Sequence, residues 1–213
     1  MDENLRTFLQ HHSNIKYSLF LKKLKQSIYT PIAQLNVFVH KSTEPICFDD
    51  IKNERFDNIK IGDSWGGFFD CAWFKFTANI ENMQKNLVAV IDVGGEGCIY
   101  NKNGEVIQGI TNVLGMVDNF QTVKGKAIIP LDRIDTFNDG KVLFYADCGN
   151  NGKGGKSSGQ ARFKRADICV FRQDILDLYY DILACYQLLS AVNDNARKRE
   201  IKAYINKAIS LAY

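Results

Sequence analysis

The segment from Ile61 to Phe76 places a glycine-rich turn directly before an aromatic strand, and it constrains the fold more than any other part of the chain. The turn, residues 62–67, contains three glycines and Trp65. Glycines there permit positive φ angles or the close approach of another surface. From residue 70 the side chains alternate, with Ala72, Phe74, Phe76 and Ala78 on one face and Cys71, Trp73, Lys75 and Thr77 on the other. This alternation predicts a β-strand with one face in a core.

Two later segments repeat the arrangement of an apolar strand followed by a glycine-rich elbow. The first runs from Leu87 to Val93 and continues into Gly94-Gly95-Glu96-Gly97. The second runs from Val142 to Ala146 and continues into Asp147-Cys148-Gly149-Asn150-Asn151-Gly152. Between them lies Gln108-Gly109-Ile110-Thr111.

The expected strands cover residues 34–39, 70–79, 86–93, 97–101, 105–110, 126–131, 142–147 and 166–171. No helical pattern separates the strands from residue 70 onward, which favours antiparallel pairing over a parallel α/β sheet. Strands of this kind must stack or close to bury their apolar faces. The sequence therefore predicts a mainly β protein, built as an antiparallel two-sheet sandwich.

In order and spacing, these motifs resemble the N-terminal region of glycoside hydrolase family 38 α-mannosidases of the bacterial and cytosolic type. The resemblance extends from about Lys60 to the C-terminus. It implies a jelly-roll, galactose-binding-like sandwich that precedes a catalytic domain. The expected partner is therefore the catalytic domain of the same enzyme.

The resemblance also implies where the chemistry lies. In that family a zinc-type divalent metal is held by histidine and aspartate ligands beside an aspartate nucleophile, in a domain that follows this one. The three histidines of this chain, His11, His12 and His40, form no His-x-His-x-Asp or His-Glu-x-x-His pattern. The chain ends at Tyr213, before the first metal motif of the family, so we assign no catalytic, cofactor or metal residue and expect the chain alone to be inactive.

Composition excludes several other functions. The 213 residues carry a formal net charge of only +3, which argues against nucleic-acid binding. No apolar run reaches the roughly 20 residues of a membrane helix, and no signal-type segment opens the chain, so we expect a cytoplasmic location. Six cysteines without a Cys-x-x-Cys spacing predict free thiols. Four of them, Cys71, Cys98, Cys169 and Cys185, lie in apolar patterns and are expected to be buried.

Helical patterns occupy both ends of the chain. Ser13 is expected to cap a first helix whose apolar stripe contains Tyr17, Phe20, Leu21, Leu24 and Ile28. A second stripe contains Ile175, Leu178, Tyr179, Ile182, Tyr186 and Leu189, and a third contains Ile201, Tyr204, Ile205, Ala208 and Ala212. We therefore divide the chain into a helical segment (1–30), a β-sandwich (31–172) and a helical hairpin (173–213) that leads toward a catalytic domain. Residues 46–56 are interpreted as a loop.

Three candidate sites have structural alternatives. Residues 149–157 approximate a phosphate-binding loop, but Asn150 stands where glycine is needed and no helix pattern follows, so we favour a surface loop. Glu96 could accept sugar hydroxyls or only close a turn, and the turn is favoured. Glu96 and Asp147 are rejected as a glycosidase acid–nucleophile pair, because the family places its chemistry elsewhere.

The third candidate is an aromatic group formed by Trp65, Phe68 and Phe69. Such rings can stack on sugars beside polar groups such as Asp63 or Asn151, or they can close the core or contact the next domain, and the second reading is favoured. The possible sugar or interdomain contacts are Trp65, Phe68, Phe69, Glu96, Asp147 and Asn150. His11, His12 and His40 are interpreted as surface residues.

The leading functional hypothesis is an inactive accessory domain of an α-mannosidase. The complete enzyme would hydrolyse α-linked mannose from oligosaccharides. The alternative is a free-standing carbohydrate-binding module that recognises mannose-containing oligosaccharides. A truncated gene product without an independent role is a third possibility. Loss of an interdomain surface would leave an apolar patch, which a homodimer could cover.

Overall fold

The computed structural model describes residues 3–81, 84–111, 126–134, 140–152 and 159–212. These residues form two compact units. One unit is the β-rich segment Pro31–Phe171, and the other combines Met1–Thr30 with Arg172–Tyr213. The helical ends of the chain, which the sequence treats as two separate segments, thus belong to one unit.

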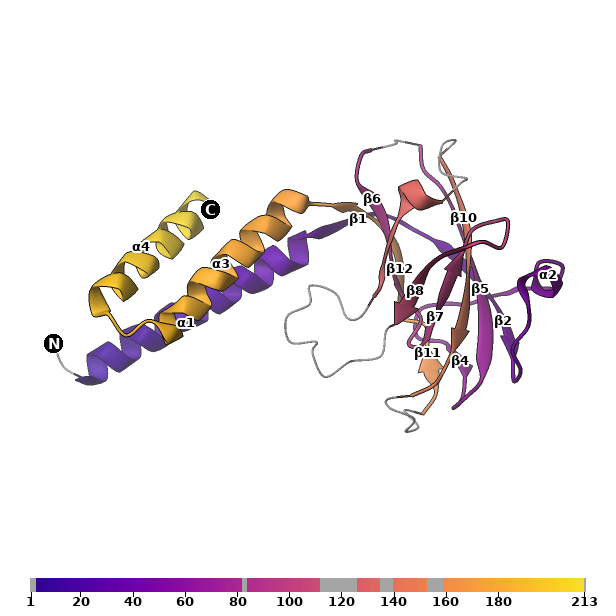
Figure 1. Ribbon diagram of the computed structural model, residues 1–213, viewed down its shortest axis with the longest axis horizontal. Coiled ribbons are helices and arrows are strands. Elements are labelled where there is room, and N and C mark those ends of the chain that lie inside the picture. Colours follow the sequence, from indigo (N-terminus) through magenta and orange to yellow (C-terminus); the bar gives the residue numbers. More distant parts are fainter. Residues whose placement is uncertain (1–2, 82–83, 112–125, 135–139, 153–158, 213) are drawn as a thin grey trace. The chain divides into compact units, whose positions relative to one another are not determined.

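A six-stranded sheet forms one layer of the β unit (Figure 1). Its strand order is β3-β2-β5-β10-β7-β8, and each neighbouring pair is antiparallel. The strands are β2 (Asn36–Ser42), β3 (Asp57–Asn58), β5 (Cys71–Asn79), β7 (Glu96–Tyr100), β8 (Val106–Thr111) and β10 (Lys141–Gly149). The aromatic strand predicted at 70–79 is β5. It lies inside the sheet, between β2 and β10.

A four-stranded sheet with the order β1-β12-β6-β9 forms the opposing layer. Its strands are β1 (Tyr29–Gln34), β6 (Leu87–Asp92), β9 (Ile128–Pro130) and β12 (Arg165–Phe171), and a separate pair joins β4 (Ser64–Gly66) to β11 (Ala161–Arg162). The main core contains side chains of both sheets, including Phe74 and Phe76 of β5, Ile91 of β6 and Ile168 of β12. The predicted antiparallel sandwich is therefore confirmed.

The outer face of β5 is also covered, which the alternation of its side chains does not indicate. Trp73 and Tyr145 form a second apolar cluster with Ile51, and Phe48 packs against it. The indole nitrogen of Trp73 donates to the Ile46 carbonyl at 2.9 Å. The covering segment contains α2 (Phe48–Ile51), so the interpretation of residues 46–56 as a loop was wrong for these four residues.

The helical unit consists of α1 (Glu3–Ser27), α3 (Gln173–Ala191) and α4 (Asn195–Leu211). Helix α1 begins ten residues before Ser13, so the predicted cap at Ser13 was wrong. The apolar stripe predicted for α1 is confirmed, since Tyr17, Phe20, Leu21, Leu24 and Ile28 are all buried. None of the helices in the described ranges is long and apolar enough to cross a bilayer.

Helix α1 contacts both C-terminal helices, and these contacts join the two ends of the chain in one unit. The rings of Tyr17 and Tyr186 meet edge to face at 5.9 Å, and Lys16 donates to the Asn206 side chain at 3.0 Å. Asp194 caps α4 by accepting from two backbone N–H groups. The stripe predicted for this helix is correct at Ile205 but wrong at Tyr204 and Ala212, which are exposed, and Ile209 is buried instead.

All six cysteines are free thiols. Cys148 and Cys169 are buried, whereas Cys47 is exposed. The predicted burial is wrong for Cys71, Cys98 and Cys185, which are partly exposed. Cys71 and Cys98 belong to the outer face of the six-stranded sheet, where the cover provided by residues 46–56 is incomplete.

Candidate functional site

The three glycine-rich elbows meet around the side chain of Trp65. Trp65 is only 2% exposed, its ring meets Phe74 edge to face at 5.6 Å, and its Nε1 donates to the Val93 carbonyl at 2.6 Å. The indole therefore closes the core of the sandwich. It is not an exposed platform for a sugar, so the structure agrees with the favoured interpretation that Trp65 closes the core.

Glycine is required where the elbows approach the indole. A Cβ atom on Gly95 would lie 2.9 Å from Trp65 Cζ2 and 2.8 Å from the Gly149 carbonyl oxygen. A Cβ atom on Gly97 would overlap the Asp147 carbonyl group. The three motifs that are separate in the sequence are thus one packing arrangement. We call Trp65, Gly67, Gly95, Gly149 and Asn150 the elbow cluster.

Asn150 holds the elbow cluster together by hydrogen bonds. Its side chain is 1% exposed, and Nδ2 donates to the carbonyl oxygens of Gly67 at 2.8 Å and Gly159 at 2.9 Å. Its backbone N–H donates to Asp70 O at 3.0 Å, and its carbonyl accepts from Phe69 N at 2.9 Å. Asn150 is therefore an internal brace, and the expectation that it contacts a sugar or another domain is wrong for its buried side chain.

Phe68 and Phe69 lie at the surface of this braced turn. Phe69 is 62% exposed, and its ring lies 3.9 Å from that of Phe68. Its φ angle of 68° is in the left-handed region, which non-glycine residues rarely adopt. The turn is fixed by the Asp70 carboxylate, which accepts from Gly67 N at 2.7 Å. The fold thus holds an exposed aromatic ring in a strained conformation, and such strain is often associated with a contact surface.

Glu96 and Asp147 line one shallow pocket of about 320 Å³, together with Cys71, Cys98 and Asn151. Glu96 accepts from the Thr111 hydroxyl at 3.2 Å. Burial raises the pKa of the Asp147 carboxyl, and burial followed by the charge of Asp147 raises the pKa of the Cys71 thiol. Cys71 is therefore held in its unreactive protonated form.

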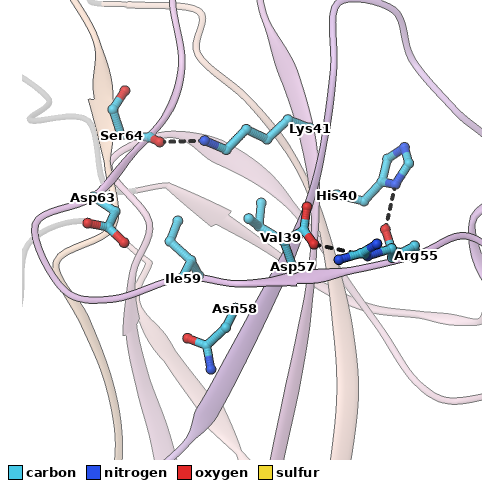
Figure 2. Close-up of a pocket in the computed structure, with 9 residues that line it drawn as sticks. All are labelled: Val39, His40, Lys41, Arg55, Asp57, Asn58, Ile59, Asp63 and Ser64. Atoms are coloured by element: carbon cyan, nitrogen blue, oxygen red, sulfur yellow. Dashed lines mark hydrogen bonds and ion pairs between the residues drawn. The ribbon is translucent and has the colours of Figure 1, made fainter.

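A larger pocket of about 560 Å³ lies beside β2, β3 and β4 (Figure 2). We call it the edge pocket, because β3 is the edge strand of the six-stranded sheet. The described residues that line it are Val39, His40, Lys41, Arg55, Asp57, Asn58, Ile59, Asp63 and Ser64. It therefore combines an apolar pair, Val39 and Ile59, with side chains of both charges.

Hydrogen bonds fix the walls of the edge pocket. Lys41 Nζ reaches across to donate to the Ser64 carbonyl at 2.8 Å, and the Asp63 carboxylate accepts from Lys60 N at 2.9 Å (Figure 2 shows the first). His40 Nδ1 lies 2.9 Å from the Arg55 carbonyl, which only accepts, so Nδ1 must carry the proton. Arg55 and Asp57 form an ion pair at 3.2 Å.

Sequence reasoning missed most of the edge pocket. It placed His40 on the surface and named Asp63 only as a neighbour of the aromatic residues. Lys41 and Arg55 carry no periodic signal, and Arg55 follows a short helix that was interpreted as a loop. The pairing of β2 with β3, which brings these residues together, spans only two residue pairs.

Within the described ranges, no three His, Cys, Asp or Glu side chains gather closely enough to hold a metal ion. The phosphate-loop candidate at 149–157 lies in part, at residues 153–157, outside the described residues.

The chain matches a protein-family model. The model described as the jelly-roll domain of α-mannosidase, for the first domain of the Ams1-like group, matches residues 30–170. This range contains all the strands of both sheets except the first and last residues of the four-stranded layer. Comparison with curated proteins gives no match.

Proposed function

The chain belongs to the α-mannosidase jelly-roll domain family, and from this premise we propose that it is an accessory domain that packs on the catalytic domain of an α-mannosidase. The family match over residues 30–170 carries the proposal, and the confirmed antiparallel sandwich agrees with it. The complete enzyme would hydrolyse α-mannosidic bonds in oligosaccharides.

In this proposal the reaction belongs to the catalytic domain. A zinc-type ion there would supply Lewis-acid chemistry to the sugar, and no step is assigned to residues of this chain. The accessory domain would instead shape or stabilise its partner through a fixed surface.

The turn at Phe68 and Phe69 is the surface we propose for that contact. An exposed aromatic ring on a rigid backbone loses little conformational freedom when it binds, and aromatic side chains are frequent anchors of interfaces. Phe69 meets both conditions, since it is 62% exposed and its backbone is bonded to Asn150.

Two measurements test this function. The 213-residue chain is assayed on an aryl α-mannoside with added zinc, and we expect no turnover. Measurable turnover would contradict the proposal that the reaction belongs to the catalytic domain. The chain is also mixed with a separately produced α-mannosidase catalytic domain, and we expect a complex that Phe69→Ser weakens about tenfold or more. Val106→Ser, at a side chain that is 60% exposed on β8, is the matched control and should leave the affinity unchanged.

A free-standing carbohydrate-binding module is the second candidate, and the exposed ring of Phe69 is the observation in its favour. Trp65 no longer supports it, because the indole is buried. Titration calorimetry with manno-oligosaccharides checks it: a heat of binding that Phe69→Ala abolishes would favour this candidate. The predicted cytoplasmic location and the homodimer stay predictions.

A further inference from the structure

We propose that the edge pocket binds one ring of a neutral saccharide, at a site separate from the surface of Phe68 and Phe69. The pocket has a volume of about 560 Å³, which lies within the usual range for small-molecule sites. This proposal does not depend on the role of the domain in an α-mannosidase. It rests on the charge balance, the unused hydrogen-bonding groups and the preformed walls of the pocket.

The charges of the edge pocket favour a neutral ligand. Lys41 and Arg55 supply two positive charges, and Asp57 and Asp63 supply two negative charges. A charged ligand of either sign would therefore be attracted by two of these side chains and repelled by the other two. A polyhydroxylated ligand has no net charge and avoids this penalty.

The hydrogen-bonding capacity of the pocket matches hydroxyl groups. An ammonium group has three donors, and Lys41 uses one of them on the Ser64 carbonyl. A carboxylate accepts at both oxygens, and Asp63 uses Oδ2 for the Lys60 N–H. Each sugar hydroxyl donates one hydrogen bond and accepts others. Neighbouring hydroxyls can thus donate to Asp63 and accept from Lys41 at the same time.

The floor and walls of the pocket are formed before any ligand arrives. Val39 and Ile59 belong to the buried core and close the floor of the pocket, so the polar groups of the walls would hold a ligand. The backbone of Ile59 donates to the Val37 carbonyl at 3.2 Å, which fixes this floor. Lys41 is held in place by Ser64, and the Arg55 carbonyl is held by His40 (Figure 2). A preorganised site loses less entropy on binding than a flexible one.

The test is an NMR titration of backbone amides in the whole chain with methyl α-mannoside and methyl α-glucoside. We expect shifts confined to the edge pocket, with a Kd on the order of 1 mM because the site is open to solvent. Asp63→Asn should weaken binding about tenfold, because a sugar hydroxyl can then no longer donate to a charged carboxylate. The Asn side chain can still accept from Lys60 N, so the loop should keep its conformation. Lys41→Met should have a similar effect.

Matched controls come from α2, where Asp49 and Lys52 form an exposed ion pair that does not line the pocket. Asp49→Asn and Lys52→Met should leave the Kd unchanged. Arg55→Gln, at a side chain that is 90% exposed, offers a third pocket variant that is expected to fold normally.

Several outcomes would overturn the proposal. One is the absence of shifts at about 50 mM glycoside, far above a millimolar Kd. Another is binding of inorganic phosphate in preference to the glycosides. A third is a glycoside response centred on Phe68 and Phe69 that Asp63→Asn does not alter. None of these results bears on the complex with a catalytic domain, which is measured separately.

Discussion

The elbow cluster and the edge pocket lie in the same β unit but use their polar groups in opposite ways. In the elbow cluster, the side chains of Asn150 and Trp65 donate hydrogen bonds to backbone carbonyls and are shielded from solvent. In the edge pocket, Lys41 and Asp63 each make one bond to the backbone and retain further capacity. The cluster that is richest in sequence motifs thus maintains the fold, whereas binding capacity lies in residues without a motif.

The largest expected effect of a substitution belongs to Trp65. Trp65→Ala should lower the free energy of unfolding by about 3–5 kcal/mol, because it empties a packed site and leaves the Val93 carbonyl without its donor. Urea unfolding followed by circular dichroism measures the change. Phe69→Ala, at a ring that is 62% exposed, should cost much less. A similar loss for both variants would show that Trp65 does not close the core.

Asn150 gives a sharper comparison, because Asn150 is buried whereas Asn58, the asparagine of the edge pocket, is exposed. Asn150→Ala should lower the free energy of unfolding by about 2 kcal/mol, since the Gly67 and Gly159 carbonyls lose a buried donor. Asn58→Ala, at an exposed residue of the edge pocket, should change it by less than about 0.5 kcal/mol. Equal effects would remove the distinction between the two regions.

Because the backbone at Phe69 is strained, a glycine there should make the protein more stable than an alanine does, which is the reverse of the usual order. Glycine normally destabilises a folded chain relative to alanine, but it enters the left-handed region without a steric cost. With a φ angle of 68° at this position, Phe69→Gly should be more stable than Phe69→Ala by about 1 kcal/mol. Thermal and urea unfolding of the two variants, which both lack the ring, isolate the backbone effect. A more stable alanine variant would mean that the turn relaxes.

The fold was predictable because its signal is periodic. Alternation from Ala72 to Ala78 indicated β5, and the order of the glycine elbows indicated the family that the match to residues 30–170 confirmed. The sequence favoured a buried Trp65 but could not establish it, because an indole in a glycine-rich turn gives the same pattern whether it faces the core or solvent. Nor could it show the edge pocket, since Lys41 and Asp63 come together only through tertiary pairing.

Asp147 is an ionisable side chain that is partly buried near the elbow cluster. Its effect on the pH dependence of stability is the smallest effect that we predict. Burial raises the pKa of its carboxyl above the ordinary value of 3.8, so the folded state keeps this proton at pH values where the unfolded state has lost it. Stability should therefore fall as the pH rises above 3.8, until the folded carboxyl also ionises. Asn cannot ionise, so Asp147→Asn should gain in unfolding free energy relative to the parent chain as the pH rises through this window. Urea unfolding at several pH values from about 4 to 7 measures the difference, with Asp57→Asn, 72% exposed in the edge pocket, as the matched substitution. A difference between Asp147→Asn and the parent chain that does not change with pH would mean that solvent reaches Asp147 freely. The region near the elbow cluster would then contain an open polar site like the one at the sheet edge.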